Sequence, residues 1–225
     1  KTLLVDGDPQ ANSTTGVGFD LHNVTQSLYD CMVNGSKAKD VILKSEIPNL
    51  DLIPSHIDLV GAEIEMINYP NRENVMKALL DEVRDKYDFI VIDCSPSLGL
   101  ITVNSLVAAD SVIVPVQCEF FALEGLAQLL NTIKLVKQTI NQSLQIRGFL
   151  PTMYSAQNNL SKQVFADLAQ HFENKLFKVD DDSYVVIPRN IKLAESPSFG
   201  KPIMLYDTTS IGTKAYTNLA KAIIG

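Results

Sequence analysis

The chain of 225 residues has only three cysteines, Cys31, Cys94 and Cys118, and their wide spacings do not match a zinc site. Cys94 and Cys118 lie in or beside apolar segments, where a free cysteine is usually a small core residue. No stretch approaches the 18 apolar residues of a membrane-spanning helix, and there is no repeat or low-complexity tract. We therefore expect one globular domain over residues 1–225 in a reducing, cytoplasmic compartment.

The formal net charge is −7, which is unusual for a protein that binds nucleic acid. The charge is uneven, because residues 141–225 hold nine Lys or Arg against seven Asp or Glu. A basic face in this part of the chain is compatible with binding to phosphates. Charge alone favours the simpler interpretation, in which these lysines are ordinary solvated side chains.

Strand-like and helix-like segments alternate along the chain. The strand-like segments are continuously apolar, which is typical of parallel strands covered on both faces. The helical segments carry apolar residues at helical spacing. This alternation predicts an α/β fold with a doubly wound, mostly parallel sheet and helices on both faces. The predicted strands are Thr2–Asp6, Leu50–Ile53, Phe89–Asp93, Ser111–Val116, Gln145–Met153 and Tyr184–Ile187, and the predicted helices are Arg72–Lys86, 120–138, Leu160–Phe172 and 211–222.

Two of the predicted strands end in aspartate. Asp6 ends the first strand and Asp8 follows it, and Asp93 ends the strand that begins at Phe89. Ligands of open α/β sheets bind beyond the carboxyl ends of the strands, where these acids are expected to meet. Carboxylates in such a place can hold Mg²⁺ or orient an attacking water. The alternative for each acid is a turn or a helix cap.

Four segments together resemble the ParA/Soj family of partitioning ATPases, deviant P-loop proteins of the MinD-like superfamily. LLVDGDPQANST resembles the second nucleotide-associated motif of this family, and FIVIDCSPSL resembles its Walker B segment. VIVPVQCEFFALEG is similar to the stretch after the next strand, and VIPRNIKLAESPSFG resembles the loop that contacts the nucleotide base. Their order also matches. These segments are Leu3–Thr14, Phe89–Leu98, Val112–Gly125 and Val186–Gly200.

The resemblance implies a role for four residues. Asp8 matches the catalytic acid that positions the attacking water, and Asp93 matches the Walker B acid that holds Mg²⁺ through water. Pro188 and Asn190 match positions that contact adenine. An asparagine amide offers a donor pair and an acceptor, which suits a purine edge. For Asn190 the alternative is a turn asparagine.

The resemblance also implies partners. Members of the family dimerise with ATP, bind DNA without sequence preference on the nucleoid, and are stimulated by a ParB/Spo0J-like centromere-binding protein. Arg189 and Lys192 match the region linked to DNA contact. Gln157 stands where relatives carry an arginine, which weakens the DNA prediction by one cation. Backbone binding of this kind needs only a basic surface.

The phosphate-binding loop of the family is absent, since the sequence contains no G-x-x-x-x-G-K-S/T motif. In the family this loop precedes the LLVDGDP strand, so the sequence resembles a member that lacks its first strand, loop and helix, roughly 30 residues at typical element lengths. Without the loop, the β- and γ-phosphates lose their backbone N–H groups and lysines. We expect the chain as given to be inactive toward ATP, with unpaired edges in its sheet.

Other functions stay open at this point. The missing loop is compatible with a non-catalytic interaction module of the same fold. Membrane-cycling division-site ATPases look similar but end in an amphipathic helix that anchors them to the membrane. Residues 211–222 carry an apolar stripe but lack the basic face and the bulky aromatic face of such an anchor. Iron–sulfur carriers of the superfamily use paired cysteines, which this sequence lacks. The acidic segment Val179–Ser183 departs from the family and is interpreted as a solvated hairpin tip.

Overall fold

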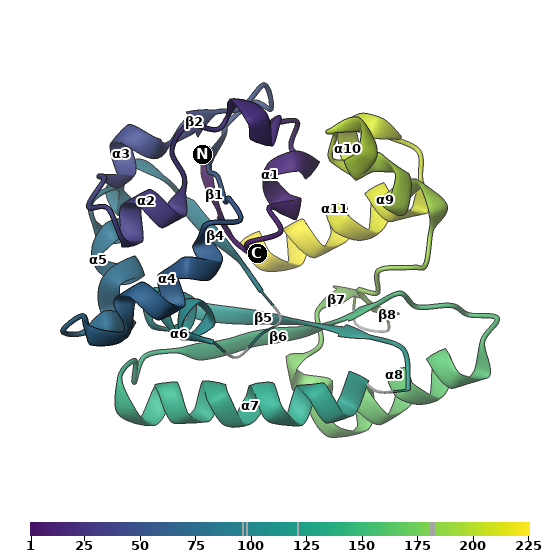
Figure 1. Cartoon of the computed structure of the whole chain (residues 1–225). Coiled ribbons are helices and arrows are strands. Elements are labelled where there is room, and N and C mark those ends of the chain that lie inside the picture. The colour runs from purple at the N-terminus through teal and green to yellow at the C-terminus, as the bar shows by residue number, and fades with distance from the viewer. Residues whose placement is uncertain (96, 98, 121, 181–182) are drawn as a thin grey trace. The chain divides into compact units, whose positions relative to one another are not determined.

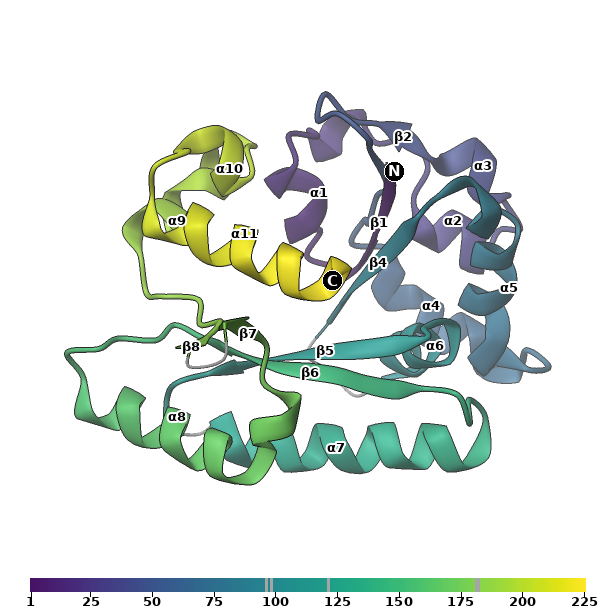
Figure 2. The ribbon, with the colours of Figure 1, turned by 180° about the vertical axis from the view of Figure 1, so that it is seen from behind.

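The computed structural model describes residues 1–95, 97, 99–120, 122–180 and 183–225 (Figures 1 and 2). These residues form two compact units. Unit 1 comprises Lys1–Ala109, Val136–Gln142 and Pro197–Lys201, and unit 2 comprises Asp110–Leu135, Ser143–Ser196 and Pro202–Gly225. The chain therefore passes between the units several times, and the single domain expected over residues 1–225 stays a prediction.

Unit 1 is built on a sheet with the strand order β2-β3-β1-β4. The strands β3, β1 and β4 are parallel, and the short β2 pairs with β3 in the antiparallel direction. The mostly parallel arrangement agrees with the apolar runs of the sequence, and Leu3 and Val5 of β1 are fully buried. The strands are β1 (Thr2–Gly7), β2 (Leu43–Lys44), β3 (Leu50–Ile53) and β4 (Phe89–Cys94).

Short helices surround this sheet. In Figure 1, α2, α3 and α5 lie on one side of β1 and α1 lies on the other. Leu28, Leu59 and Met76 are fully buried and join the core of the unit. The helices are α1 (Asn12–Gly16), α2 (Leu28–Met32), α3 (Ala38–Val41), α4 (Leu59–Glu65), α5 (Val75–Asp81) and α6 (Leu100–Ala108), with 3₁₀ turns η1 (Leu21–Asn23), η2 (Met66–Asn68), η3 (Arg72–Asn74) and η4 (Arg84–Lys86).

The helix predicted over Arg72–Lys86 is shorter than expected. The α-helical part is α5 alone, with the 3₁₀ turns η3 before it and η4 after it. The backbone leaves the helical region at Asn74, with φ −104° and ψ 4°, and again at Val83, with φ −125° and ψ −4°. The side chain of Asn104 binds across the start of this segment, which favours the break over a continuous helix.

Unit 2 contains two small sheets. The strands β5 and β6 are parallel, with a register shift between Val112 and Ile113, and β7 and β8 form an antiparallel pair. Figure 1 shows α7 and α8 along one side of β5 and β6. The elements are β5 (Ser111–Gln117), α7 (Ala122–Thr139, in unit 2 up to Leu135), β6 (Gln145–Thr152), α8 (Asn159–Phe172), η5 (Glu173–Lys175), β7 (Lys178–Asp180), β8 (Ser183–Tyr184), α9 (Ile191–Glu195), η6 (Ser196–Phe199, mostly unit 1), α10 (Ile203–Tyr206) and α11 (Ile211–Ile224).

The strand predicted at Tyr184–Ile187 is wrong beyond Tyr184. The segment is extended, but its amides bind separate neighbours: Val185 donates to Phe177 O at 2.8 Å and Ile187 to Pro151 O at 2.8 Å. The proline that follows has no N–H group, so the ladder cannot continue. Of the acidic segment Val179–Ser183, residues 181 and 182 lie outside the described residues.

The helix predicted over residues 211–222 is α11, and it packs against the apolar core of unit 2. Leu219 of α11 lies in a cluster with Leu150, Phe177 and Ile187. In the described ranges, no helix is both long enough and apolar enough to span a bilayer. The predicted α/β class, with a mostly parallel sheet flanked by helices, is confirmed.

Asn104 provides a test of how unit 1 is held together. This buried side chain accepts from Met76 N at 3.0 Å and donates to Arg72 O at 2.9 Å and Leu100 O at 3.0 Å. Asn104→Leu would leave Met76 N without a partner and remove one donor from Arg72 O, so we expect a loss of about 2 kcal/mol in the free energy of unfolding, measured with urea. Gln170→Leu, on the exposed side of α8, is the matched control. An equal effect of both substitutions would contradict this role.

Candidate functional site

The carboxyl ends of β1 and β4 coincide. Their parallel register pairs Asp6 with Asp93 and Gly7 with Cys94, and Asp8 follows β1 directly. Gly7 permits this close approach, because a Cβ atom there would lie 2.8 Å from the carbonyl oxygen of Asp93. The acids that the sequence analysis placed at the ends of two strands therefore lie at one edge of one sheet.

Asp6 is fully buried. Its Oδ2 accepts from the backbone N and from Oγ1 of Thr14, each at 2.7 Å, and its Oδ1 accepts from Asp8 N at 3.2 Å. Burial raises the pKa of Asp6, the hydrogen bonds from Thr14 and Asp8 partly offset this, and the charge of Asp93 raises it further. The position is therefore that of a structural carboxylate whose oxygens are already engaged.

Thr14 connects α1 to two strands. Besides binding Asp6, its Oγ1 accepts from Ser55 N at 3.0 Å, just beyond β3. The turn into α1 passes through Ala11, whose φ of 53° lies in the left-handed region. Ser55 Oγ is buried and has no hydrogen-bond partner within the described part of the chain. Thr14 and Ser55 were not predicted from the sequence, since neither residue type signals such a contact.

Asp93 is half-buried and its Oδ2 accepts from Ser13 Oγ at 2.6 Å. Ser13 was also missed, although it lies within the LLVDGDPQANST segment. A hydroxyl beside a carboxylate is a set of hard oxygen ligands that fits Mg²⁺. Across the described ranges, no group of three or more His, Cys, Asp or Glu could hold a metal ion. Phosphate and water oxygens would therefore have to complete the coordination.

Asp8 has a local role in the structure. It is half-buried, and its Oδ1 accepts from Gln10 N at 3.0 Å, which is the turn that the sequence analysis gave as the alternative. This bond leaves Oδ2 of Asp8 for other contacts, since only Oδ1 is used in it. The turn places the carboxylate beside the end of β1, in the same unit as Asp93.

The predicted base-contact residues lie in unit 2. Hydrogen bonds fix the backbone around Pro188: Tyr154 N donates to Ile187 O at 3.1 Å, and Arg189 N donates to Tyr154 O at 2.9 Å. Asn190 is the N-cap of α9, and its Oδ1 accepts from Lys192 N at 2.8 Å. Asn190 thus has a capping role, which resembles the turn role named as its alternative.

The two predicted DNA-binding cations are paired with carboxylates. Arg189 Nη2 binds Glu119 Oε1, and Lys192 Nζ binds Glu195 Oε2 at 2.9 Å. The bond to Glu195 raises the pKa of Lys192, and its ammonium lies 5.6 Å from the ring centroid of Tyr206. Both cations remain about half exposed, so each pair is open to solvent.

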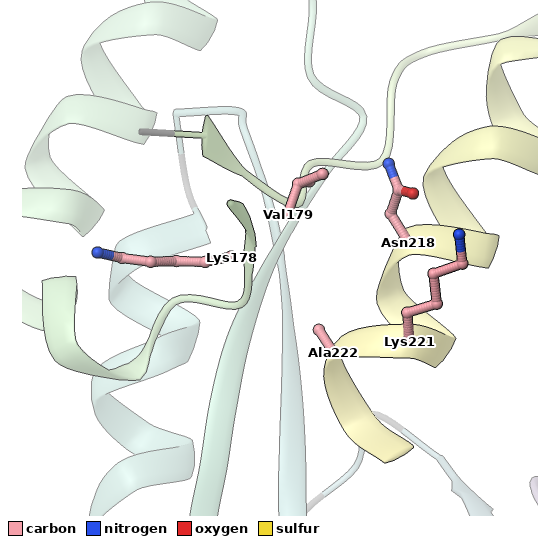
Figure 3. A pocket seen from close by; sticks show the side chains of 5 residues that line it. All are labelled: Lys178, Val179, Asn218, Lys221 and Ala222. Atoms are coloured by element: carbon pink, nitrogen blue, oxygen red, sulfur yellow. The ribbon is translucent and has the colours of Figure 1, made fainter. Parts of the chain in front are cut away.

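A pocket of about 240 Å³ lies elsewhere in unit 2, between β7 and α11. Figure 3 shows Asn218 and Lys221 on the helix, while the side chain of Lys178 points away from them. The ammonium group of Lys178 instead lies over the ring of Tyr184, 5.6 Å from the ring centroid. None of the predicted site residues lines this pocket. Its two lysines do not point toward one place, so the pocket is not a phosphate site.

Thr14 allows the acid edge to be tested. Thr14→Val removes a donor from the buried Asp6 and leaves Ser55 N unpaired, so we expect a loss of about 2–4 kcal/mol in the free energy of unfolding. Thr14→Ser should restore most of this. Thr15→Val is the control, because Thr15 Oγ1 binds the carbonyls of Ala11 and Asn12 in its own turn. Urea unfolding checks all three variants, and an equal loss in Thr14→Val and Thr15→Val would refute the network.

Comparisons with known proteins place this geometry in a family. The family described as "AAA domain" matches residues 1–146. The chain is 48% identical over 223 residues to the sporulation initiation inhibitor protein Soj of Bacillus subtilis, covering 99% of this chain and 86% of that protein. It is 43% identical over 224 residues to the chromosome partitioning protein ParA of Myxococcus xanthus, covering 100% of this chain and 77% of that protein.

Solved structures show the same fold. Cobyrinic acid a,c-diamide synthase from Mycobacterium smegmatis is 32% identical, with a TM-score of 0.83 over 100% of this chain and 82% of that one. A structure of that synthase with a bound ATP analogue and magnesium is 33% identical, with a TM-score of 0.76 over 89% and 80% of the two chains. Soj and ParA are more similar to the chain in sequence than the synthase is, and they match 99% and 100% of its length. The chain therefore belongs to the ParA/Soj family of chromosome-partitioning ATPases.

Proposed function

We propose that this protein, when its fold is completed by a phosphate-binding loop, is an ATP-dependent DNA-segregation ATPase. In this proposal it dimerises with ATP, binds DNA non-specifically and is stimulated by a ParB-like centromere-binding protein. The observation that carries the proposal is the meeting of Asp6, Asp8 and Asp93 at one edge of parallel strands, with Ser13 bound to Asp93. This edge is where α/β sheets hold phosphorylated ligands.

Each residue has a distinct task in the proposed reaction. Asp93 and Ser13 offer oxygens toward Mg²⁺ and its waters, and the metal would neutralise phosphate charge when bound. Asp8 orients the attacking water through Oδ2. Asp6 contacts neither, since its oxygens are bound by Thr14 and Asp8, and it positions α1 instead. The proposal thus separates a structural acid from two that serve the chemistry.

We also propose that the phosphate cradle comes from a segment outside these 225 residues. Within the described chain β4 hydrogen-bonds only to β1, and Phe89 and Val91 on one face of β4 are 45% and 50% exposed. An apolar parallel strand is normally buried on both faces. The bare face and edge of β4 therefore fit one further strand and its helix, which would carry the glycine-rich loop.

The DNA proposal depends on Lys192 and Arg189. Both are solvent-exposed cations, and each is bound to one glutamate in the structure. Exposed ion pairs of this kind contribute little to stability, so a DNA phosphate can replace the glutamate at low cost. Cations that contact the phosphate backbone of DNA, and not its bases, bind DNA without sequence preference.

A non-catalytic interaction module is the second candidate. It is favoured by one observation, the absence of a G-x-x-x-x-G-K-S/T motif from the sequence. The nucleotide-binding experiment below separates the two candidates, because a module that has lost its chemistry would not regain it with a phosphate loop.

A chimera tests the ATPase proposal. The strand, phosphate loop and first helix of Bacillus subtilis Soj are fused before Lys1, and the 225-residue chain alone is the control. We expect micromolar binding of an ATP analogue by the chimera and none by the control. Asp8→Ala in the chimera should keep ATP-dependent dimerisation and lower hydrolysis at least a hundredfold, as expected for loss of the group that orients water. Loss of dimerisation instead would show that the role given to Asp8 is wrong.

Lys192→Glu tests the DNA surface in the same chimera. We expect weaker retention on DNA and a fall of about one in the slope of log affinity against log salt, because one phosphate contact is lost. ATP binding should not change. Lys39→Glu, an equal charge change on α3 of unit 1, is the control. Retention that is the same for both variants at low salt would remove Lys192 from the interface.

A further inference from the structure

A row of large aliphatic side chains is exposed on α4, on η2 and on the turn that precedes α4 in unit 1. Ile57, Val60, Ile64 and Ile67 are each more than half exposed, and we call these four residues the α4 stripe. They are separated by three, four and three positions, which places them on one face of a helix. Exposed apolar patches on an otherwise acidic surface commonly mark an interaction site.

The stripe is not needed to anchor the helix. The opposite face of the same segment carries Leu59, Ala62 and Met66, which are fully buried in the core of unit 1. A helix that is apolar on both faces is normally buried on both faces. The inner face already fixes the segment, so the outer one is left for a partner.

The backbone holds the stripe in place. Val60 N donates to Ile57 O at 3.1 Å, so the helical turn begins early enough to carry Ile57 on the same face. At the other end, Tyr69 N donates to Met66 O at 3.0 Å and Arg72 Nη1 donates to Ile67 O at 3.0 Å. The four aliphatic side chains are therefore displayed on a preformed support, which lowers the entropy cost of binding.

The borders of the stripe are acidic. With 3.6 residues per turn, Glu63 falls on one flank of the stripe and Asp58 and Glu65 fall on the other. The sequence has no Lys or Arg between Lys44 and Arg72. Asp58 contacts the His56 ring at 2.9 Å, whereas Arg72, the first cation after the stripe, is bound to Glu73 at 3.1 Å and does not neutralise the border acids.

Charge complementarity selects the occupant. A second copy of the chain, bound through the same face, would bring like-charged borders together, which is unfavourable. An anionic membrane surface would be repelled for the same reason, since interfacial helices carry basic borders. We propose that the α4 stripe is the docking surface for an amphipathic helix of a partner protein whose apolar face is bordered by lysine or arginine.

A designed peptide tests this docking surface on the 225-residue chain without nucleotide, so the result is independent of the ATPase proposal. The probe is an 18-residue fluorescent helix with leucine at positions i, i+3, i+4 and i+7 and lysine on both borders. We expect saturable binding by anisotropy, weakened at least tenfold when salt rises from 50 to 300 mM. The same peptide with glutamate borders should bind at least tenfold more weakly.

Two variants locate the binding. Ile64→Ser should lower the affinity for the peptide at least tenfold, whereas Ile224→Ser on α11, outside the stripe, should leave it unchanged. Ile224 is a matched control because the two isoleucines are similarly exposed, at 72% and 69%. Far-UV circular dichroism verifies that both variants keep the fold. Absence of saturable binding, or equal weakening by both variants, would overturn the proposal.

Two further outcomes would also overturn it. If sedimentation velocity shows that the chain dimerises and that Ile64→Ser makes it monomeric, the stripe is an interface between copies. If the chain binds phosphatidylglycerol vesicles and Ile64→Ser abolishes this, the stripe is a membrane contact. A monomeric chain that ignores the vesicles and binds the lysine-bordered peptide supports the proposal.

Discussion

The hydrogen bonds from Thr14 to the buried carboxylate of Asp6 hold the acid edge of unit 1 together. A carboxylate without exposed surface is costly unless donors surround it, and here the donors come from the start of α1 and from Asp8 N. The same contacts fix α1 against the end of β1. Because α1 also carries Ser13, the contact of the Ser13 hydroxyl with Asp93 depends on the bonds between Thr14 and Asp6.

The meeting of the acids at one edge was predictable from the sequence. Two apolar runs that both end in aspartate imply parallel strands whose carboxyl ends align, and the register of β1 with β4 shows this alignment. The residues that hold the acids were not predictable. α1 has five residues, too few for a periodic pattern to emerge, and its place is set by contacts with Asp6 and Ser55 that are distant in the sequence.

Dependence on contacts between distant residues also explains where the fold predicted from the sequence was incomplete or wrong. α2, α3 and α4 have four to seven residues and are held by the core of unit 1, so local propensity reveals little of them. The apolar run Tyr184–Ile187 looks like a strand in isolation, but its amides reach separate neighbours and Pro188 ends the pattern. The bounds of long elements such as α8 and β6 were predicted to within a residue or two, because each is long enough for its own apolar pattern to identify it.

Asn190 links two events that are usually considered separately. Its amide oxygen caps α9, the helix that begins at Ile191 and carries Lys192. A ligand that recruits this oxygen would withdraw the cap, at a cost of about 1 kcal/mol to the first turn of a helix only five residues long. The geometry of Lys192 would then follow the occupancy of Asn190. One small amide would thereby couple the binding of such a ligand to the orientation of a cation on the protein surface.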